Sequence, residues 1–235
     1  MRRTALVIFA VLLVLGFCTL LFLTSGYEGA RGSSGNPYLT VGASETGAVN
    51  LVSGIYLNYR LYDSLFELLI FSMAVLGVRF YLNVDESKKP NVARIAESPV
   101  VRIAADLLFG PIVMIGLYLI IFGHLSPGGG FSGGAVGGTG LLLCAAALGA
   151  EVVARRFHEH IIEQIEWGIL VMILLFSIAP VFFGRMPLTD LLPLGQAGAL
   201  LSGGTIPIYN ILIGIKVFIG AWVVIYSFVH HRGEI

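Results

Sequence analysis

The sequence carries little charge. Only 12% of its 235 residues are charged and 57% are hydrophobic, with a mean hydropathy of +0.90. A soluble domain carries about 25% charged residues, so this composition excludes a water-soluble globular protein. Basic and acidic residues both number 14, so no basic excess favours nucleic acid as a partner. The composition predicts an all-α integral membrane protein, because a chain this apolar spans the bilayer as helices.

Cysteines and catalytic motifs are also scarce. The two cysteines, Cys18 and Cys144, both lie inside apolar runs, so a disulfide framework is not expected. No lysine followed by serine or threonine closes a G-x-x-x-x-G pattern, which excludes a phosphate-binding loop. No nearby cluster of serine, cysteine or acid offers a nucleophile or a metal-ligand set to His124. We predict a non-catalytic chain that binds no metal and no cofactor.

The sequence contains six long apolar runs, each close to the roughly 20 residues that a membrane-spanning helix needs. They cover residues 4–24, 65–83, 103–123, 134–154, 166–183 and 208–229. The first run follows Met-Arg-Arg, as in a signal peptide. It is longer than the roughly 7–15 apolar residues of such a peptide and lacks an A-x-A site, so an anchor helix is expected. A long Gly-rich loop follows, whose second half has the apolar spacing of a short interfacial helix.

Lysine and arginine are distributed unevenly between the predicted loops. Ten of them fall on one side of the membrane: Arg2, Arg3, Arg79, Lys88, Lys89, Arg94, Arg102, Arg155, Arg156 and Arg232. Only Arg31, Arg60 and Arg185 fall on the other side. Because basic loops stay in the cytoplasm, both termini are predicted to be cytoplasmic, and the Gly-rich loop is predicted to lie outside.

A polar segment, KKPNVARIAESP at 88–99, divides the chain. Its composition is typical of a cytoplasmic linker. It separates a two-span unit, residues 1–87, from a four-span unit, residues 100–235. The division indicates a fusion of two smaller units.

A run of glycines, GHLSPGGGFSGGAVGG at 123–138, interrupts the apolar sequence. Residues 124–130 are predicted to form a tight outer turn, because a lipid-facing segment cannot leave its backbone unsatisfied. Gly130, Gly134 and Gly138 then recur every four residues, which favours close approach of another helix. The alternative is an irregular backbone that lines a polar cavity, with His124 as a titratable group beside it.

Two charges in or near the predicted spans are candidates for an ion path. Lys216 lies near the middle of the last span, where a charge costs at least about 2.5 kcal/mol. It is either a proton-relay group or a structural charge that pairs with an acid on a neighbouring subunit or snorkels outward. Glu67 is either an ion-path carboxylate or part of a capping box with Ser64 at the start of the second span.

Asp106 and Glu151 are further candidates, near the cytoplasmic ends of their spans. Arg102 precedes Asp106 by four residues and Arg155 follows Glu151 by four, so ordinary i,i+4 ion pairs are the alternative to an ion path. Near the start of the last span, Pro207 suits an early helix position, and Asn210 can form a hydrogen bond across helices. Packing is the expected role of both.

The glycine run resembles the signature of the B subunit of Mrp-type sodium/proton antiporters, the MnhB domain. The matching residues are Gly123, His124, Pro127, Gly128, Gly129, Gly130, Phe131, Gly133 and Gly134. This resemblance covers roughly residues 98–232. Residues 45–67 are similar to the C-terminal end of the antiporter A subunit, through Gly47, Asn50, Val52, Arg60, Asp63 and Glu67.

The resemblance implies a membrane subunit of a multisubunit antiporter module in the cytoplasmic membrane, with antiporter-like subunits as partners and Na⁺ and H⁺ as the transported ions. A fused A-end and B subunit favours the archaeal respiratory assemblies, the membrane-bound hydrogenases and sulfane sulfur reductases. The alternative function is a purely structural scaffold that holds such a module together.

Overall fold

The computed structural model describes residues 36–82, 99–154 and 159–230, with isolated positions between 11 and 22. The described residues contain helices and no strand, which confirms the predicted all-α class. The elements are α2 (Asn36–Thr46), α3 (Leu51–Gly54), the π-helix η1 (Ile55–Tyr59), α4 (Leu61–Tyr81), α5 (Pro99–Ile121), α6 (Gly130–Leu148), α7 (Ala150–Ala154), α8 (Glu159–Phe182) and α9 (Ile206–His230). Most of the predicted run 4–24 and nearly all of the linker 88–99 lie outside the described residues.

Five of the described helices, α4, α5, α6, α8 and α9, are long and apolar enough to cross a membrane. They correspond to the last five predicted runs, although α4, α5 and α6 each begin four residues earlier than predicted and two other boundaries differ more. Helix α8 begins at Glu159 rather than at 166, because Ile161, Ile162 and Ile165 extend its apolar face. The predicted run 134–154 is broken at Gly149, whose φ of +90° ends α6 before the short α7.

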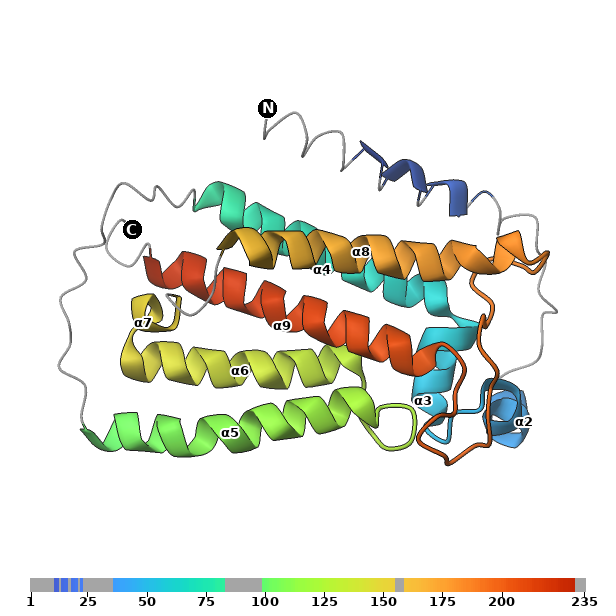
Figure 1. Cartoon of the computed structure of the whole chain (residues 1–235), viewed down its shortest axis with the longest axis horizontal. Helices are drawn as coiled ribbons and strands as arrows, with labels where there is room; N and C mark the ends of the chain where they lie inside the picture. The colour runs from blue at the N-terminus through green and yellow to red at the C-terminus, as the bar shows by residue number, and fades with distance from the viewer. Residues whose placement is uncertain are drawn as a thin grey trace.

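Helix α9 lies at the centre of the arrangement (Figure 1). It contacts α6 on one side and α4 and α8 on the other, and α5 covers the far side of α6. As a result α6 and α9 are the most buried of the five spans, and α5 is the least buried. Helices α8 and α9 run antiparallel, with the start of α8 near the end of α9.

The glycines of α6 make this close packing possible. A Cβ atom on Gly134 would lie 2.5 Å from the Gly214 carbonyl oxygen of α9. A Cβ atom on Gly133, on a neighbouring face of α6, would lie 2.6 Å from the Gly116 carbonyl oxygen of α5. The backbones on both sides therefore occupy the space that any side chain at these positions would need.

The start of α4 differs from the predicted capping box. The π-helix η1 ends at Tyr59, and Arg60, which precedes the first residue of α4, makes no side-chain cap. The Ser64 hydroxyl is buried in the first turn and donates to the Tyr56 carbonyl oxygen, which lies within the π-helix. The capping box of Ser64 and Glu67 was therefore wrong, because the helix begins four residues earlier than the apolar run. Arg60 instead forms an ion pair with Asp63.

Candidate functional site

A buried ion pair joins α8 and α9. Lys216 is only 1% exposed, and its Nζ atom donates a hydrogen bond to Oε1 of Glu166. Its neighbours Ile213 and Val217 on α9 belong to the main apolar core. Removing two charges from water costs several kcal/mol per ion, so each charge here depends on the other.

The sequence located Lys216 but missed its partner. Glu166 is the first residue of the predicted run 166–183, so the sequence placed it at the edge of the membrane rather than in the interior. Since α8 begins at Glu159, Glu166 lies seven residues inside the helix, about 10 Å along its axis. The acid that pairs with Lys216 is thus in this chain rather than on a neighbouring subunit. The apolar residues at 161, 162 and 165 were the signal that could have extended the helix.

A second polar contact lies two turns along α9 from Lys216. The Tyr209 hydroxyl and the Ser177 hydroxyl of α8 are 3.2 Å apart, and Ser177 donates to the Ile173 carbonyl oxygen over 2.8 Å. Tyr209 and Ser177 are both buried. Neither residue was singled out in the sequence, because tyrosine and serine are common in membrane helices.

At one end of the bundle, Asp190 anchors the long loop before α9. Its carboxylate accepts hydrogen bonds from the backbone N–H of Thr205 (3.0 Å) and the Thr205 hydroxyl (2.8 Å), and from the side-chain amide of Asn58. The Arg185 guanidinium donates to the Asp190 carbonyl oxygen over 3.0 Å. Asp190 is the one acid in the stretch between α8 and α9, and that isolation was the available signal.

The glycine turn is held by the residues that resemble the A-subunit end. The side-chain amide of Asn50 donates to the carbonyl oxygens of Gly123 (2.7 Å) and Ser126 (2.9 Å), and its backbone N–H donates to that of His124 (2.9 Å). The Ser53 hydroxyl also donates to the Gly123 carbonyl oxygen, over 2.6 Å. The segment before α4 and the turn after α5 therefore form one hydrogen-bonded junction.

Helix α9 reaches the same junction through Asn210. Its side-chain oxygen accepts a hydrogen bond from the backbone N–H of Gly130 over 2.9 Å, which satisfies a donor at the start of α6. Gly129, with φ of +155°, has no room for a side chain, since a Cβ atom would lie 2.1 Å from the Tyr56 hydroxyl. Pro207 is the second residue of α9.

His124 is enclosed in this junction. The ring is fully buried, and its Nε2 atom lies 3.1 Å from the Leu200 carbonyl oxygen. Burial lowers the pKa of His124, and hydrogen bonds to backbone carbonyls, that of Leu200 first among them, offset part of this decrease. The structure thus favours a neutral imidazole packed against loop backbone.

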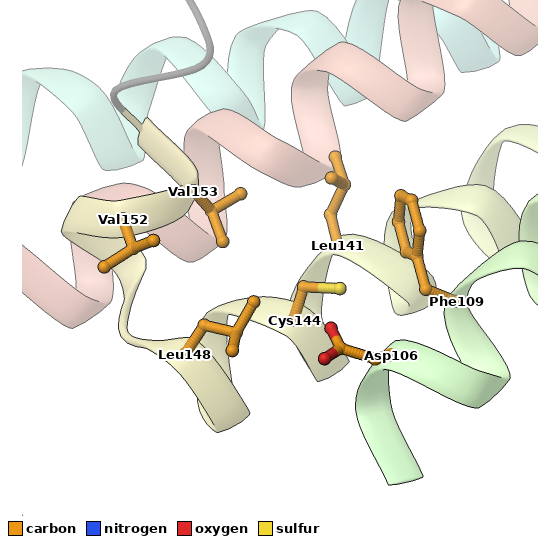
Figure 2. A pocket seen from close by; sticks show the side chains of 7 residues that line it. All are labelled: Asp106, Phe109, Leu141, Cys144, Leu148, Val152 and Val153. Atoms are coloured by element: carbon orange, nitrogen blue, oxygen red, sulfur yellow. The ribbon is translucent and has the colours of Figure 1, made fainter. Parts of the chain in front are cut away.

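The remaining predicted ion-path residues are not gathered with Lys216. Asp106 lines a cavity of about 140 Å³ with Phe109, Leu141, Cys144, Leu148, Val152 and Val153 (Figure 2). Within the described residues it forms no ion pair with Arg102, so that expected pair was wrong, because the carboxylate faces this cavity beside α6. Glu67 is exposed on α4. Glu151 belongs to α7, and its side chain is outside the described part of the structure.

These features define a multi-pass helical membrane protein whose interior holds an ion pair. The family described as "Domain related to MnhB subunit of Na+/H+ antiporter" matches residues 100–223. The chain belongs to this family, which confirms the resemblance drawn from the glycine run.

Solved structures and a curated relative share the fold or sequence of the chain. A chain of the membrane-bound sulfane sulfur reductase, an archaeal respiratory membrane complex, is 30% identical with a TM-score of 0.73, over 97% of this chain and 99% of that one. A chain of the Mrp complex from Dietzia sp. matches all of this chain and 27% of its own length, with a TM-score of 0.68 and 24% identity, and so shows the fold alone. An uncharacterized protein of Methanocaldococcus jannaschii is 26% identical over 196 residues, 73% of each chain.

Proposed function

We propose that this chain is a non-catalytic membrane subunit of an Mrp-type sodium/proton antiporter module within a respiratory complex, and that Lys216 and Glu166 lie on its proton path. The buried ion pair in the membrane-spanning interior is the observation that carries the proposal. Ionisable residues inside membrane segments are rare and mark ion pathways and proton relays. The match to the sulfane sulfur reductase chain supports the respiratory setting.

The chemistry of the pair suits reversible proton transfer. A proton that reaches the Glu166 carboxylate neutralises it and leaves the Lys216 ammonium as an uncompensated cation in an apolar core. Release of a proton from Lys216 removes that charge, and transfer of the proton on Glu166 to the lysine amine then restores the ion pair. The site therefore carries a net positive charge only between these two steps, and it is neutral before and after them, as a low-dielectric interior favours.

The orientation of the subunit follows from its loops. The uneven distribution of arginine and lysine supports a cytoplasmic location for both termini and for the start of α8, in the cytoplasmic membrane. The glycine turn and the Asp190 cluster then face the outside. Na⁺ and H⁺ are the proposed transported ions, and antiporter-like membrane subunits are the proposed partners.

A scaffold function is the second candidate. The close contacts of Gly130, Gly134 and Gly138 with α9, and the hydrogen bonds of Asn50 to the glycine turn, favour it. In that case, the residues of the family motif hold helices together, and Lys216 and Glu166 are dispensable for transport.

Three variants in the complete complex separate these functions. Lys216→Met removes one charge, and Lys216→Met with Glu166→Leu removes both. Arg102→Met is the matched control, because it removes an exposed positive charge from α5. Subunit content is measured first, and sodium-driven proton movement in inverted vesicles second. We expect the double variant to assemble without transport. Normal transport by an assembled double variant would establish the scaffold function instead.

A further inference from the structure

The contact between α8 and α9 alternates between polar and apolar layers. Asp190 and Thr205, both in the loop that joins the two helices, form the first polar layer, at the end where α9 begins. Tyr209 and Ser177 form the second layer. The buried pair of Lys216 and Glu166 forms the last one. Tyr209 and Lys216 share one face of α9, because they are seven residues apart, and Thr205 immediately precedes the helix.

An apolar layer separates the last two polar layers. It consists of Ile213 on α9 with Ile169 and Ile173 on α8, which are 5%, 6% and 3% exposed. All three belong to one core cluster, together with leucines of α4. Tyr209 and Lys216 are seven residues apart, about 10 Å along the helix, so no direct proton transfer connects them. A layer of apolar side chains of this kind blocks ions until water enters it.

The opposite side of the ion pair has a different character. The Glu166 side chain is 11% exposed, whereas that of Lys216 is 1% exposed. Glu163 lies one turn before Glu166 on the same face of α8, and it is only partly buried. Of the two acidic residues on α4, Asp63 pairs with Arg60, and Glu67 is exposed near the start of the helix. Glu163 is therefore a described acidic residue one turn from the ion pair, towards the end of the bundle where α8 begins.

We propose that Ile169, Ile173 and Ile213 form a hydrophobic gate, and that Lys216 and Glu166 exchange protons through Glu163 with the side at which α8 begins. Protons reach Tyr209 and Ser177 only when water enters the layer of three isoleucines. This inference rests on the proposed proton-path function of Lys216 and Glu166, and it assigns the direction of access and the residues that control it.

The first test measures passive proton leak through the complete complex in proteoliposomes. A pH gradient is imposed without sodium and without redox turnover, and a trapped pH-sensitive dye reports its decay. We expect Ile213→Ser to accelerate the decay several-fold, because a hydroxyl lets water enter the layer. Ile213→Leu, which keeps an apolar side chain of the same size, is the matched control and should decay at the wild-type rate.

A double variant shows whether the leak uses the ion pair. Ile213→Ser combined with Lys216→Met should return the decay to the wild-type rate. A leak that persists without Lys216, or an assembled Ile213→Ser complex that does not leak, overturns the gate. Normal sodium-driven proton movement in Lys216→Met would contradict the proposed proton-path function. That transport measurement is independent of the two leak measurements, so the two failures can be told apart.

A labelling experiment tests the gate where Ile213→Ser does not assemble. Single cysteines replace Ile213 or the exposed Thr189 in a chain with Cys18→Ala and Cys144→Ala. A small cationic methanethiosulfonate is then added to permeabilised vesicles, so that both faces are accessible. We expect the cysteine at Thr189 to react and the cysteine at Ile213 to stay unmodified. Equal reaction rates at the two positions would show that the layer is wet and that there is no gate.

Discussion

Helix α9 forms two interfaces of opposite character. Towards α6 the contact is backbone against backbone, and glycines remove the side chains that would keep the two helices apart. Towards α8 the contact is made by large side chains, among them isoleucines, Tyr209 and the pair of Lys216 and Glu166. The first interface fixes the distance between helices, whereas the second provides chemical groups. The glycines of the family motif and the charged residues therefore have separate roles, on two sides of one helix.

The largest effect should come from adding a side chain to the glycine interface. Gly134→Leu places its first carbon 2.5 Å from the Gly214 carbonyl oxygen and 2.8 Å from the Val217 Cβ atom. Neither α6 nor α9 can shift to make room for this side chain inside a packed bundle. We expect no assembled complex on a native gel. Gly110→Leu is the matched control on α5, since a Cβ atom there meets nothing within 4 Å. Equal assembly of both variants would contradict the division between the interfaces.

The next largest effect should come from the charged interface. Lys216→Met leaves Glu166 without its cation, which costs about 3–5 kcal/mol for a buried pair. Adding Glu166→Leu should restore most of that stability, because two apolar residues can replace an ion pair. The measurement is thermal unfolding of the purified complex in detergent. A double variant that is less stable than Lys216→Met would mean that the two charges do not compensate each other.

A smaller effect is expected at the glycine turn, where α6 begins. Asn50→Ala removes the side-chain hydrogen bonds to Gly123 and Ser126. We expect a loss of about 2–3 kcal/mol, since each bond contributes about 1 kcal/mol and buried carbonyl oxygens are left unsatisfied. Thermal unfolding measures this change, and Asn36→Ala, at the first residue of α2, serves as the control. An unchanged melting temperature for Asn50→Ala would show that the junction holds without this residue.

The smallest effect concerns pH. Because burial lowers the pKa of His124, this side chain takes up a proton at a higher pH in the unfolded chain than in the folded one. Stability is therefore complete above the ordinary histidine pKa of about 6.5 and falls as the pH decreases below it, by at most about 1.4 kcal/mol per pH unit. We expect the melting temperature of His124→Gln to fall less with decreasing pH than that of the wild type, when melting curves of the two are compared. If the variant were as sensitive to acid as the wild type, the acid sensitivity would come from another residue.

Much of the fold could be predicted from composition and periodicity, because lipid imposes helices of a fixed minimum length. The helix boundaries were less predictable. Glu159 and Glu163 made the start of α8 look polar, although Ile162 already packs against the core. The π-helix before α4 also has no sequence signal, because it depends on how the Ser64 hydroxyl meets the Tyr56 carbonyl oxygen.

The candidate site shows the same limit. Lys216 could be found because a cation in an apolar run is costly wherever the helix packs. Glu166 could not be paired with it, because 50 residues separate the two, and only the antiparallel packing of α8 and α9 brings them together. Asp106 and Arg102 have the spacing of an ion pair, yet the neighbouring helix turns the carboxylate towards a cavity. Contacts within one helix compete with contacts between helices, and spacing along the sequence does not predict which of the two a side chain makes.

The membrane class, the apolar spans, the family signature and the presence of a charge that requires a partner could all be read from the sequence alone. These properties follow from transfer free energies and local backbone preferences, which act residue by residue. Only the tertiary structure decided which helix approaches the glycines, which acid meets Lys216, and that three isoleucines separate that ion pair from Tyr209 and Ser177. These depend on distances between residues far apart in the chain, which are fixed when the helices pack together.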